Sequence, residues 1–114
     1  MRAALEEPNS FALLAECEGA ICGYAMAWSL WDEGELTNLA VAPNARGQGI
    51  GAMLLQAVLD ECENRGATSV FLEVRADNDV AQRLYRKFGF VQVGLRRDYY
   101  GCGADAIVMK MERV

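Results

Sequence analysis

The chain has 114 residues, of which 53% are hydrophobic and 24% are charged, and its net charge is −5. This length predicts a single domain over residues 1–114, and the composition excludes a disordered chain. The acidic balance argues against nucleic acid as the main ligand, because phosphate backbones attract basic surfaces, and no apolar run is long enough to predict a membrane span. An acidic surface would suit a cationic acceptor such as an amine.

The four cysteines and the absence of histidine limit the metal sites, disulfides and catalytic mechanisms that the chain can form. The cysteines at 17, 22, 62 and 102 form no Cys-x-x-Cys pair, so we expect neither a metal site nor a disulfide framework. Reduced thiols and the lack of a signal peptide lead us to expect a cytoplasmic protein. Without histidine, Ser-His and Cys-His nucleophiles are excluded, and acid–base chemistry falls to Glu, Asp, Tyr, Cys or Lys side chains.

Hydrophobic periodicity and turn residues predict strands and helices in alternation after a polar lead-in over residues 1–9. In chain order, we predict strands over residues 11–15, 21–30 and 36–41, a helix over 50–63, a strand over 70–75, a helix from about 78 to 88, and strands over 90–95 and 106–111. In the second helix, Val80, Leu84 and Phe88 would share the buried face. The order predicts an α/β fold with a mixed, mostly antiparallel sheet and crossover helices.

A glycine-rich segment, Arg-Gly-Gln-Gly-Ile-Gly over residues 46–51, joins the third predicted strand to the first helix. A strand, a glycine turn and a helix N-terminus present unpaired backbone N–H groups and a partial positive charge to an anion. The spacing matches neither a Walker loop nor the dinucleotide fingerprint. An ordinary strand-to-helix turn is the alternative, but two alternate glycines beside Arg46 favour a phosphate ligand.

The pattern Arg-x-x-Gly-x-Gly of this segment resembles the pyrophosphate-binding signature of the GCN5-related N-acetyltransferases (GNAT), which bind acetyl-CoA. Further segments with the same resemblance follow in order: LTNLAV at 36–41, LEVRADN at 72–78, LYRKFGF at 84–90, and RRDYY at 96–100 followed by DAIVM at 105–109. Within the family, the chain is most similar to the ribosomal-protein-alanine N-acetyltransferases of the RimI type. The resemblance implies the GNAT (acyl-CoA N-acyltransferase) fold.

The N-terminus of the chain differs from the usual pattern of the family. The family normally begins with a strand and two helices ahead of the segment that starts at Phe11, and we expect this chain to lack them. Because those helices form a wall of the acceptor groove, their absence puts acceptor binding in question. A misplaced start or a fragment is the simpler explanation, and the alternative is a homodimer in which a second subunit covers the exposed sheet edge and apolar surface.

The resemblance also implies a set of acetyl-CoA contacts. Backbone N–H groups of residues 47–52 would bind the pyrophosphate, and Arg46 would fix the loop. The strand over residues 39–41 would pair with the pantetheine arm, although the core explains its apolar side chains equally well. Asn78 would contact the coenzyme, yet it can equally be a helix N-cap, as can Asp77. The implied coenzyme-binding residues are Leu39, Ala40, Val41, Arg46, Gly47, Gln48, Gly49, Ile50, Gly51, Ala52 and Asn78.

Two catalytic residues are implied in the same way. Glu73 interrupts an apolar strand, and the matching glutamate of the family is a general base that acts through water. The alternative is a solvent-facing glutamate paired with Arg75. Tyr85 matches a tyrosine that donates a proton to the departing coenzyme A thiolate. The alternative is a half-buried helix tyrosine.

The final predicted hairpin carries two adjacent aromatic residues, Tyr99 and Tyr100. In related N-terminal acetyltransferases this hairpin shapes the pocket for the first residues of a peptide, so both are candidate substrate-binding residues. Exposed neighbouring aromatics without a function are unfavourable, which supports that interpretation. We interpret Arg96 and Arg97 as solvated charges on an edge strand.

The resemblance therefore implies an N-acetyltransferase that moves acetyl from acetyl-CoA to the α-amine of a protein N-terminus, of the alanine type, by direct attack. A ribosomal protein is the implied acceptor, with no metal, nucleic acid or membrane involved. Two alternatives stay open. The acceptor can be a lysine side chain or a small-molecule amine, or the domain can bind acyl-CoA without catalysis.

Overall fold

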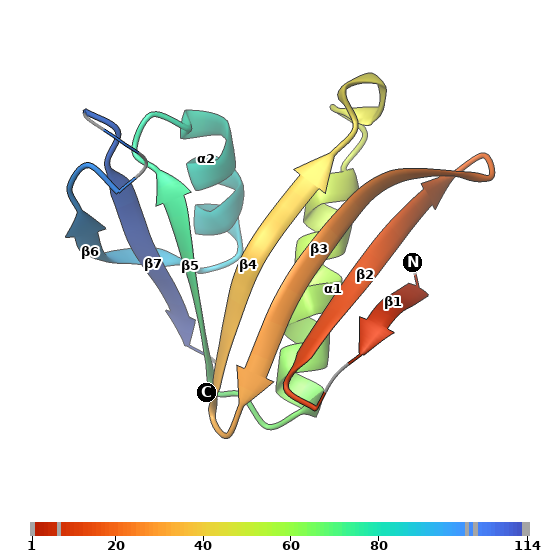
Figure 1. Cartoon of the computed structure of the whole chain (residues 1–114), viewed down its shortest axis with the longest axis horizontal. Coiled ribbons are helices and arrows are strands. Elements are labelled where there is room, and N and C mark those ends of the chain that lie inside the picture. The colour runs from red at the N-terminus through yellow and green to blue at the C-terminus, as the bar shows by residue number, and fades with distance from the viewer. Residues whose placement is uncertain (1, 7, 100, 102, 113–114) are drawn as a thin grey trace.

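The computed structural model describes residues 2–6, 8–99, 101 and 103–112. These residues form one seven-stranded sheet with the strand order β1-β2-β3-β4-β5-β7-β6, shown in Figure 1. Every neighbouring pair is antiparallel except β4 and β5, which confirms the predicted mixed, mostly antiparallel sheet. The elements are β1 (Arg2–Glu6), β2 (Ser10–Cys17), β3 (Ala20–Leu30), β4 (Glu33–Val41), the 3-10 helix η1 (Pro43–Ala45), α1 (Ile50–Asn64), β5 (Ser69–Arg75), α2 (Asp79–Lys87), β6 (Val91–Arg96) and β7 (Ala106–Glu112).

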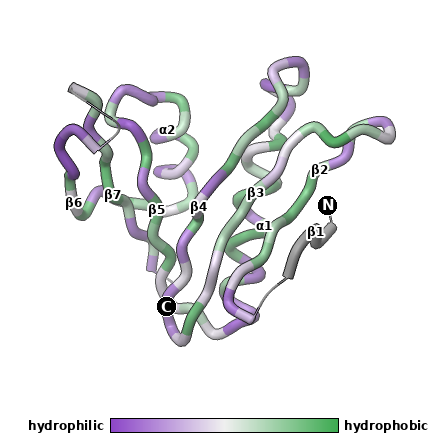
Figure 2. The backbone as a smooth tube through the Cα atoms, viewed as in Figure 1, coloured by the Kyte–Doolittle hydropathy of each residue, from purple (hydrophilic) through white to green (hydrophobic). Residues whose placement is uncertain are grey.

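The core lies between α1 and the sheet. The buried residues of α1 recur at helical spacing, as expected for a helix with one face on a core. They pack on β2, β3 and β4. Along β5, whose hydropathy Figure 2 shows, burial alternates: Val70, Leu72 and Val74 are buried, while Phe71 and Glu73 on the opposite face are half-buried. We call that opposite face of the sheet, which carries Glu73, the open face.

A strand at the N-terminus was not expected from the sequence. β1 pairs antiparallel with β2 at the edge of the sheet, from Arg2 opposite Leu14 to Glu6 opposite Phe11. The predicted polar lead-in without a strand ahead of residue 11 is therefore wrong for Arg2–Glu6. Pairing at a sheet edge depends on backbone hydrogen bonds, so a five-residue strand needs no long apolar pattern. No helix precedes β2 within residues 2–6 and 8–9.

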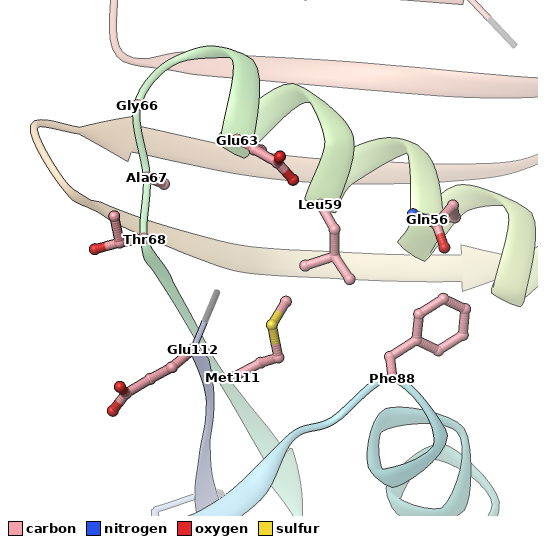
Figure 3. A pocket seen from close by; sticks show the side chains of 9 residues that line it. All are labelled: Gln56, Leu59, Glu63, Gly66, Ala67, Thr68, Phe88, Met111 and Glu112. Atoms are coloured by element: carbon pink, nitrogen blue, oxygen red, sulfur yellow. The ribbon is translucent and has the colours of Figure 1, made fainter. Parts of the chain in front are cut away.

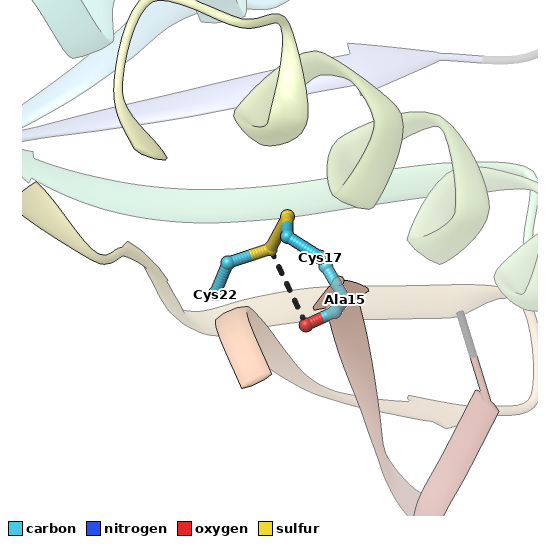
Figure 4. Close-up of a disulfide and its surroundings, with 3 residues drawn as sticks. All are labelled: Ala15, Cys17 and Cys22. Carbon is cyan, nitrogen blue, oxygen red and sulfur yellow. Dashed lines mark hydrogen bonds between the residues drawn. A yellow bond between two sulfur atoms is a disulfide. The ribbon is translucent and has the colours of Figure 1, made fainter. Parts of the chain in front are cut away.

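A disulfide links Cys17 to Cys22 across the β2–β3 hairpin (Figure 4). The register of the two strands shifts between Ala15 and Glu16, which makes Cys22 the extra residue of a β-bulge, and the two Cα atoms lie 5.8 Å apart. The expectation of reduced thiols is therefore wrong for this pair, because the hairpin register that brings them together is not visible in cysteine spacing. Cys62 is buried and is not part of this disulfide.

The fold positions its candidate site by separating two central strands. β4 and β5 pair only from Glu33 opposite Ser69 to Leu36 opposite Leu72. Beyond this point β4 stays paired with β3 and β5 with β7, so the two strands diverge (Figure 1). Residues 37–41 of β4 consequently have no strand partner on the side of β5 in the described structure, and their backbone groups on that edge can pair with a ligand.

A β-bulge in β4 lies at the point of divergence. Met26 pairs with Asn38 and Ala27 pairs with Leu36, so Thr37 is the extra residue. The Thr37 hydroxyl donates a hydrogen bond to the Met26 carbonyl oxygen at 2.9 Å and fixes the bulge. Because bulges bend the strand that carries them, this one helps to turn β4 away from β5.

Candidate active site

The glycine loop between β4 and α1 has the open backbone expected of an anion-binding turn. Gly47 and Gly49 have φ angles of +81° and +78°, in the left-handed region that favours glycine. Gly49 is the N-cap of α1, and no side chain caps the helix. No heavy atom lies within 4 Å of the position that a Cβ on either glycine would take. The first N–H groups of α1 are thus available to an anion that approaches the loop closely.

Arg46 ties this loop to the strand before it. Its Nε donates a hydrogen bond to the Val41 carbonyl oxygen at 3.3 Å. This contact links the loop to the end of β4 and is consistent with the expected role of Arg46 in fixing the loop.

A groove with a volume of about 920 Å³ lies between the diverging strands and reaches the loop. It brings together most of the residues predicted from the sequence, although they come from four segments of the chain. Gln48 and Ala52 do not line it, and neither does Tyr99. The predicted residues that line it are Leu39, Ala40, Val41, Arg46, Gly47, Gly49, Ile50, Gly51, Glu73, Asn78 and Tyr85.

Tyr85 lies on the buried side of α2 and borders the groove. It is only 8% exposed, and its ring packs edge-on against Phe90 at a centroid distance of 5.9 Å. The predicted stripe of α2 is wrong at Val80, which is 76% exposed and lines the groove instead of the core. The buried side of α2 carries Gln82, a polar residue that no apolar pattern would identify.

Gln82 fastens α2 to the end of β5. Its Nε2 donates hydrogen bonds to the carbonyl oxygens of Arg75 and Ala76, at 3.1 and 3.0 Å. A buried amide with these partners is satisfied and fixes the position of the helix that carries Tyr85.

The N-terminus of α2 follows one of the two predicted capping schemes. Asn78 Oδ1 accepts a hydrogen bond from the Ala81 N–H at 3.1 Å, which confirms Asn78 as the N-cap. Asp77 instead accepts two hydrogen bonds from the Arg75 guanidinium, at 3.1 and 3.2 Å. These bonds lower the pKa of the Asp77 carboxyl, because they favour its charged form.

Glu73 has a partner that was not predicted. Its Oε1 lies 3.1 Å from Nε of Arg96, and the Glu73 side chain is 21% exposed. The same guanidinium lies over the Tyr99 ring, with Cζ 5.5 Å from the ring centroid. The partner found for Glu73 is therefore Arg96 and not the Arg75 of the alternative interpretation. Arg96 is 57% exposed on the edge strand β6, as expected, and forms this ion pair in addition.

A second carboxylate, Glu35 of β4, lies near Glu73 and was also missed. Burial raises the pKa of the Glu35 carboxyl, and the negative charge of Glu73 raises it further. A hydrogen bond from the Trp28 indole and the positive charge of Arg96 act in the opposite direction. Glu35 gave no sequence signal, because its proximity to Glu73 depends on the pairing of β4 with β5.

The β6–β7 loop that carries the two candidate substrate-binding tyrosines is held by Asp98. Asp98 Oδ1 accepts a hydrogen bond from the Gly103 N–H at 2.7 Å, and the Asp98 N–H donates to Asp105 Oδ1 at 2.8 Å. Tyr99 is 51% exposed on this loop. Tyr100 lies outside the described residues.

A second cavity, with a volume of about 630 Å³, lies near the C-terminal end of α1 (Figure 3). Leu59 and Met111 face each other across it with Phe88 beside them, and Glu63 and Glu112 stand at its rim. None of the residues predicted for coenzyme binding or catalysis lines it. It therefore gives no support for a second site of the predicted chemistry.

Two features are absent from the described residues. No three His, Cys, Asp or Glu side chains among them are grouped so that they could hold a metal ion. In the same part of the chain, no helix combines the length and apolar character that crossing a membrane requires.

Comparison with known proteins identifies the family of the chain. The acetyltransferase (GNAT) family model matches residues 1–90. The chain is 39% identical to the putative [ribosomal protein bS18]-alanine N-acetyltransferase of Bacillus subtilis, over 92% of this chain and 70% of the relative. It is 40% identical to the [ribosomal protein bS18]-alanine N-acetyltransferase of Escherichia coli K12, over 82% of this chain and 65% of the relative. The chain thus spans about two thirds of the length of these relatives.

A solved structure has a fold similar to that of this chain. The crystal structure of the ribosomal-protein-S18-alanine N-acetyltransferase from Escherichia coli superposes with a TM-score of 0.86 at 34% identity, covering 94% of this chain and 71% of that one. The predicted resemblance in sequence and fold is thereby confirmed. From the family match, the curated relatives and the shared fold, we conclude that this chain belongs to the GNAT family of acetyltransferases.

Proposed function

We propose that this chain is an acetyl-CoA-dependent N-acetyltransferase that acts on the α-amine of a protein N-terminus. The single observation that carries the proposal is the groove, which brings an anion-binding loop, an unpaired strand edge, Glu73 and Tyr85 together. Relatives with 39 and 40% identity are named for acetylation of the alanine of ribosomal protein bS18. We therefore propose a small first residue, alanine above all, and a ribosomal protein as the acceptor.

Acetyl-CoA fits the groove by its chemistry. The uncapped N-terminus of α1 and the open loop at Gly47 and Gly49 suit a pyrophosphate. The amides of the pantetheine arm can hydrogen-bond to the unpaired edge of residues 37–41, as an added strand would. Both contacts use backbone groups, so the side chains of the loop need only leave space.

In the proposed reaction, Glu73 removes a proton from the acceptor ammonium through a water molecule. An α-amine has a pKa near 8, so it is partly protonated at neutral pH and cannot attack in that form. The free amine then attacks the thioester carbonyl carbon, the carbon–sulfur bond breaks, and the thiolate of coenzyme A leaves. Tyr85 supplies the proton to this thiolate. A phenol near pKa 10 protonates a thiolate whose thiol has a pKa near 8.5 by position and not by driving force.

The acceptor would approach from the open face. Tyr99 and Tyr100 are proposed to contact its first residues.

The proposed enzyme is a cytoplasmic protein with a single domain, and its reaction needs no metal. The Cys17–Cys22 disulfide is unusual for a reducing compartment, so a thiol titration of the freshly isolated protein bears directly on the proposed location.

The experiment that tests the function measures free-thiol release from acetyl-CoA with three acceptors. One peptide begins with a free alanine and contains no lysine, a matched peptide has a blocked N-terminus and an internal lysine, and the third acceptor is a small primary amine. Faster release with the first peptide supports the proposal. Faster release with either of the others contradicts it in favour of a lysine or small-molecule acetyltransferase. Silence with all three, at intact acetyl-CoA binding, contradicts it in favour of a binding module.

A further inference from the structure

Three charged residues on three different strands meet on the open face. Glu73 is on β5 and Arg96 is on β6, and β7 lies between these strands in the sheet. The Arg96 side chain therefore crosses β7 to bring its Nε to 3.1 Å from Glu73 Oε1. On β7, the residue opposite Arg96 is Ala106, which is 0% exposed, so a small residue leaves room for this crossing.

Glu35 joins the pair from the other side. It is opposite Phe71 in the register of β4 and β5, and Glu73 follows Phe71 by two residues on the same face. Trp28 is opposite Glu35 in the register of β3 and β4, and its indole lowers the pKa of the Glu35 carboxyl. Glu73 thus has a negative neighbour on β4 and a positive neighbour on β6. Neither neighbour lines the groove, whereas Glu73 does.

The other charged groups near Glu73 are engaged elsewhere. On β7, Lys110 lies over the Phe71 ring at 5.3 Å and pairs with Glu112 at 3.0 Å. On β5 itself, Arg75 pairs with Asp77. On α2, Tyr85 borders the same groove. Among the described residues, Arg96 pairs with Glu73, and Glu35 and Glu73 act on each other through their negative charges.

We propose that Arg96 and Glu35 are positioning residues that together set the pH range in which Glu73 accepts the proton of the acceptor amine. Arg96 holds the carboxylate in place through the ion pair, and the two neighbours put charges of opposite sign beside it. In the step concerned, a proton leaves the ammonium, reaches Glu73 through water and passes on to solvent, so no other reactant is needed. This inference rests on the proposed acetyltransferase function.

The two positioning residues should shift the pH profile in opposite directions. With saturating alanine peptide, Arg96→Gln should move the acid limb of kcat to higher pH by about one pH unit, because a cation beside a carboxylate favours its charged form. Glu35→Gln should move that limb to lower pH. The peptide amine is the same throughout, so its own ionisation does not contribute to the difference. Arg96→Lys keeps the charge and should restore most of the wild-type position.

Matched control residues lie close to Arg96 and Glu35 in the sequence. Arg97→Gln removes the same charge one residue away, and Glu33→Gln removes an exposed carboxylate two residues along β4 on the same face. Both controls should leave the acid limb in place. The proposal would be overturned if the acid limb of kcat lay at the same pH in Arg96→Gln and Arg97→Gln. It would also be overturned if Arg96→Gln and Glu35→Gln shifted this limb in the same direction.

A second measurement does not need turnover. In a pH titration of the glutamate carboxyl carbons by NMR, Glu73→Gln should lower the midpoint of Glu35, and Arg96→Gln should raise it. If the wild-type protein acetylates no amine, the proposed function fails while this titration still reports the charge cluster. A Glu35 midpoint that neither substitution moves would overturn the cluster itself.

Discussion

The two parts of the molecule on either side of the β4–β5 divergence contribute to the groove in different ways. The first part, with β1 to β4 and α1, offers backbone groups: an uncapped helix N-terminus, two left-handed glycines and an unpaired strand edge. The second part, with β5 to β7 and α2, offers the side chains of Glu73 and Tyr85, and Arg96 pairs with Glu73 from outside the groove. Binding of the coenzyme should therefore depend on backbone shape, and the chemistry on a few side chains.

The division between a coenzyme-binding part and a catalytic part is tested most severely at Glu73. Glu73→Gln should lower kcat by about 10²-fold to 10³-fold, since general-base catalysis contributes effects of this size, and should leave the Kd of acetyl-CoA within about twofold. Steady-state kinetics and calorimetric titration of acetyl-CoA measure the two quantities. Glu33→Gln is the control of equal charge. A fall in coenzyme affinity as large as the fall in kcat would break the division between the two parts.

Tyr85→Phe should have the next largest effect. Loss of the phenol proton should lower kcat at least about tenfold with acetyl-CoA affinity nearly unchanged, which is the pattern for an interaction made only in the transition state. Because Tyr85 is buried beside Phe90, thermal unfolding of the variant should be recorded alongside the kinetics. Turnover equal to that of the wild type in a folded variant would remove Tyr85 from the mechanism.

On the backbone side, Gly49→Ala can be compared with Gly19→Ala. Both glycines have left-handed φ angles, +78° and +82°, and neither has an atom within 4 Å of the position of an added Cβ. Each substitution should lower the free energy of unfolding by about 1–2 kcal/mol, the cost of that conformation for alanine. Only Gly49→Ala should also weaken acetyl-CoA binding, by about tenfold if 1.4 kcal/mol of contact is lost. Equal affinities for the two variants would show that the loop does not approach the coenzyme.

The smallest effect should come from the cap of α2. Asn78→Ala should lower the free energy of unfolding by about 1 kcal/mol, because it removes the acceptor for the Ala81 N–H. Asp77→Ala removes only an exposed ion pair and should cost less. Urea denaturation of both variants checks the order. A reversed order would mean that the cap contributes less to this part of the molecule than its geometry indicates.

What the sequence revealed of the site follows the same division. The glycine loop is contiguous, so residues 46–51 carry their own signal, and periodicity located the helices and most strands to within a few residues. The Glu73–Arg96 pair depends on the order β5-β7-β6, which brings residues 23 positions apart together across an intervening strand. No local pattern contains that information, and the nearest arginine in sequence, Arg75, turns to Asp77 instead.

The other errors have similar causes. The strand at Arg2–Glu6 and the Cys17–Cys22 disulfide both depend on the register of a neighbouring strand, and that register includes a bulge. Val80 fits the apolar stripe of α2, but the helix faces the groove at that point, so the residue is exposed there. In each case tertiary pairing overrode a local pattern.

The short contact between β4 and β5 has a mechanical consequence. Among the described residues, four residue pairs form the only ladder that joins a four-stranded sub-sheet to a three-stranded one. A ligand whose amides form hydrogen bonds with the unpaired edge of β4 would lie between the two sub-sheets and contact both. Slower amide exchange on both flanks of the junction, together with a higher melting temperature, should then report occupancy of the groove, even in a variant that has lost all turnover.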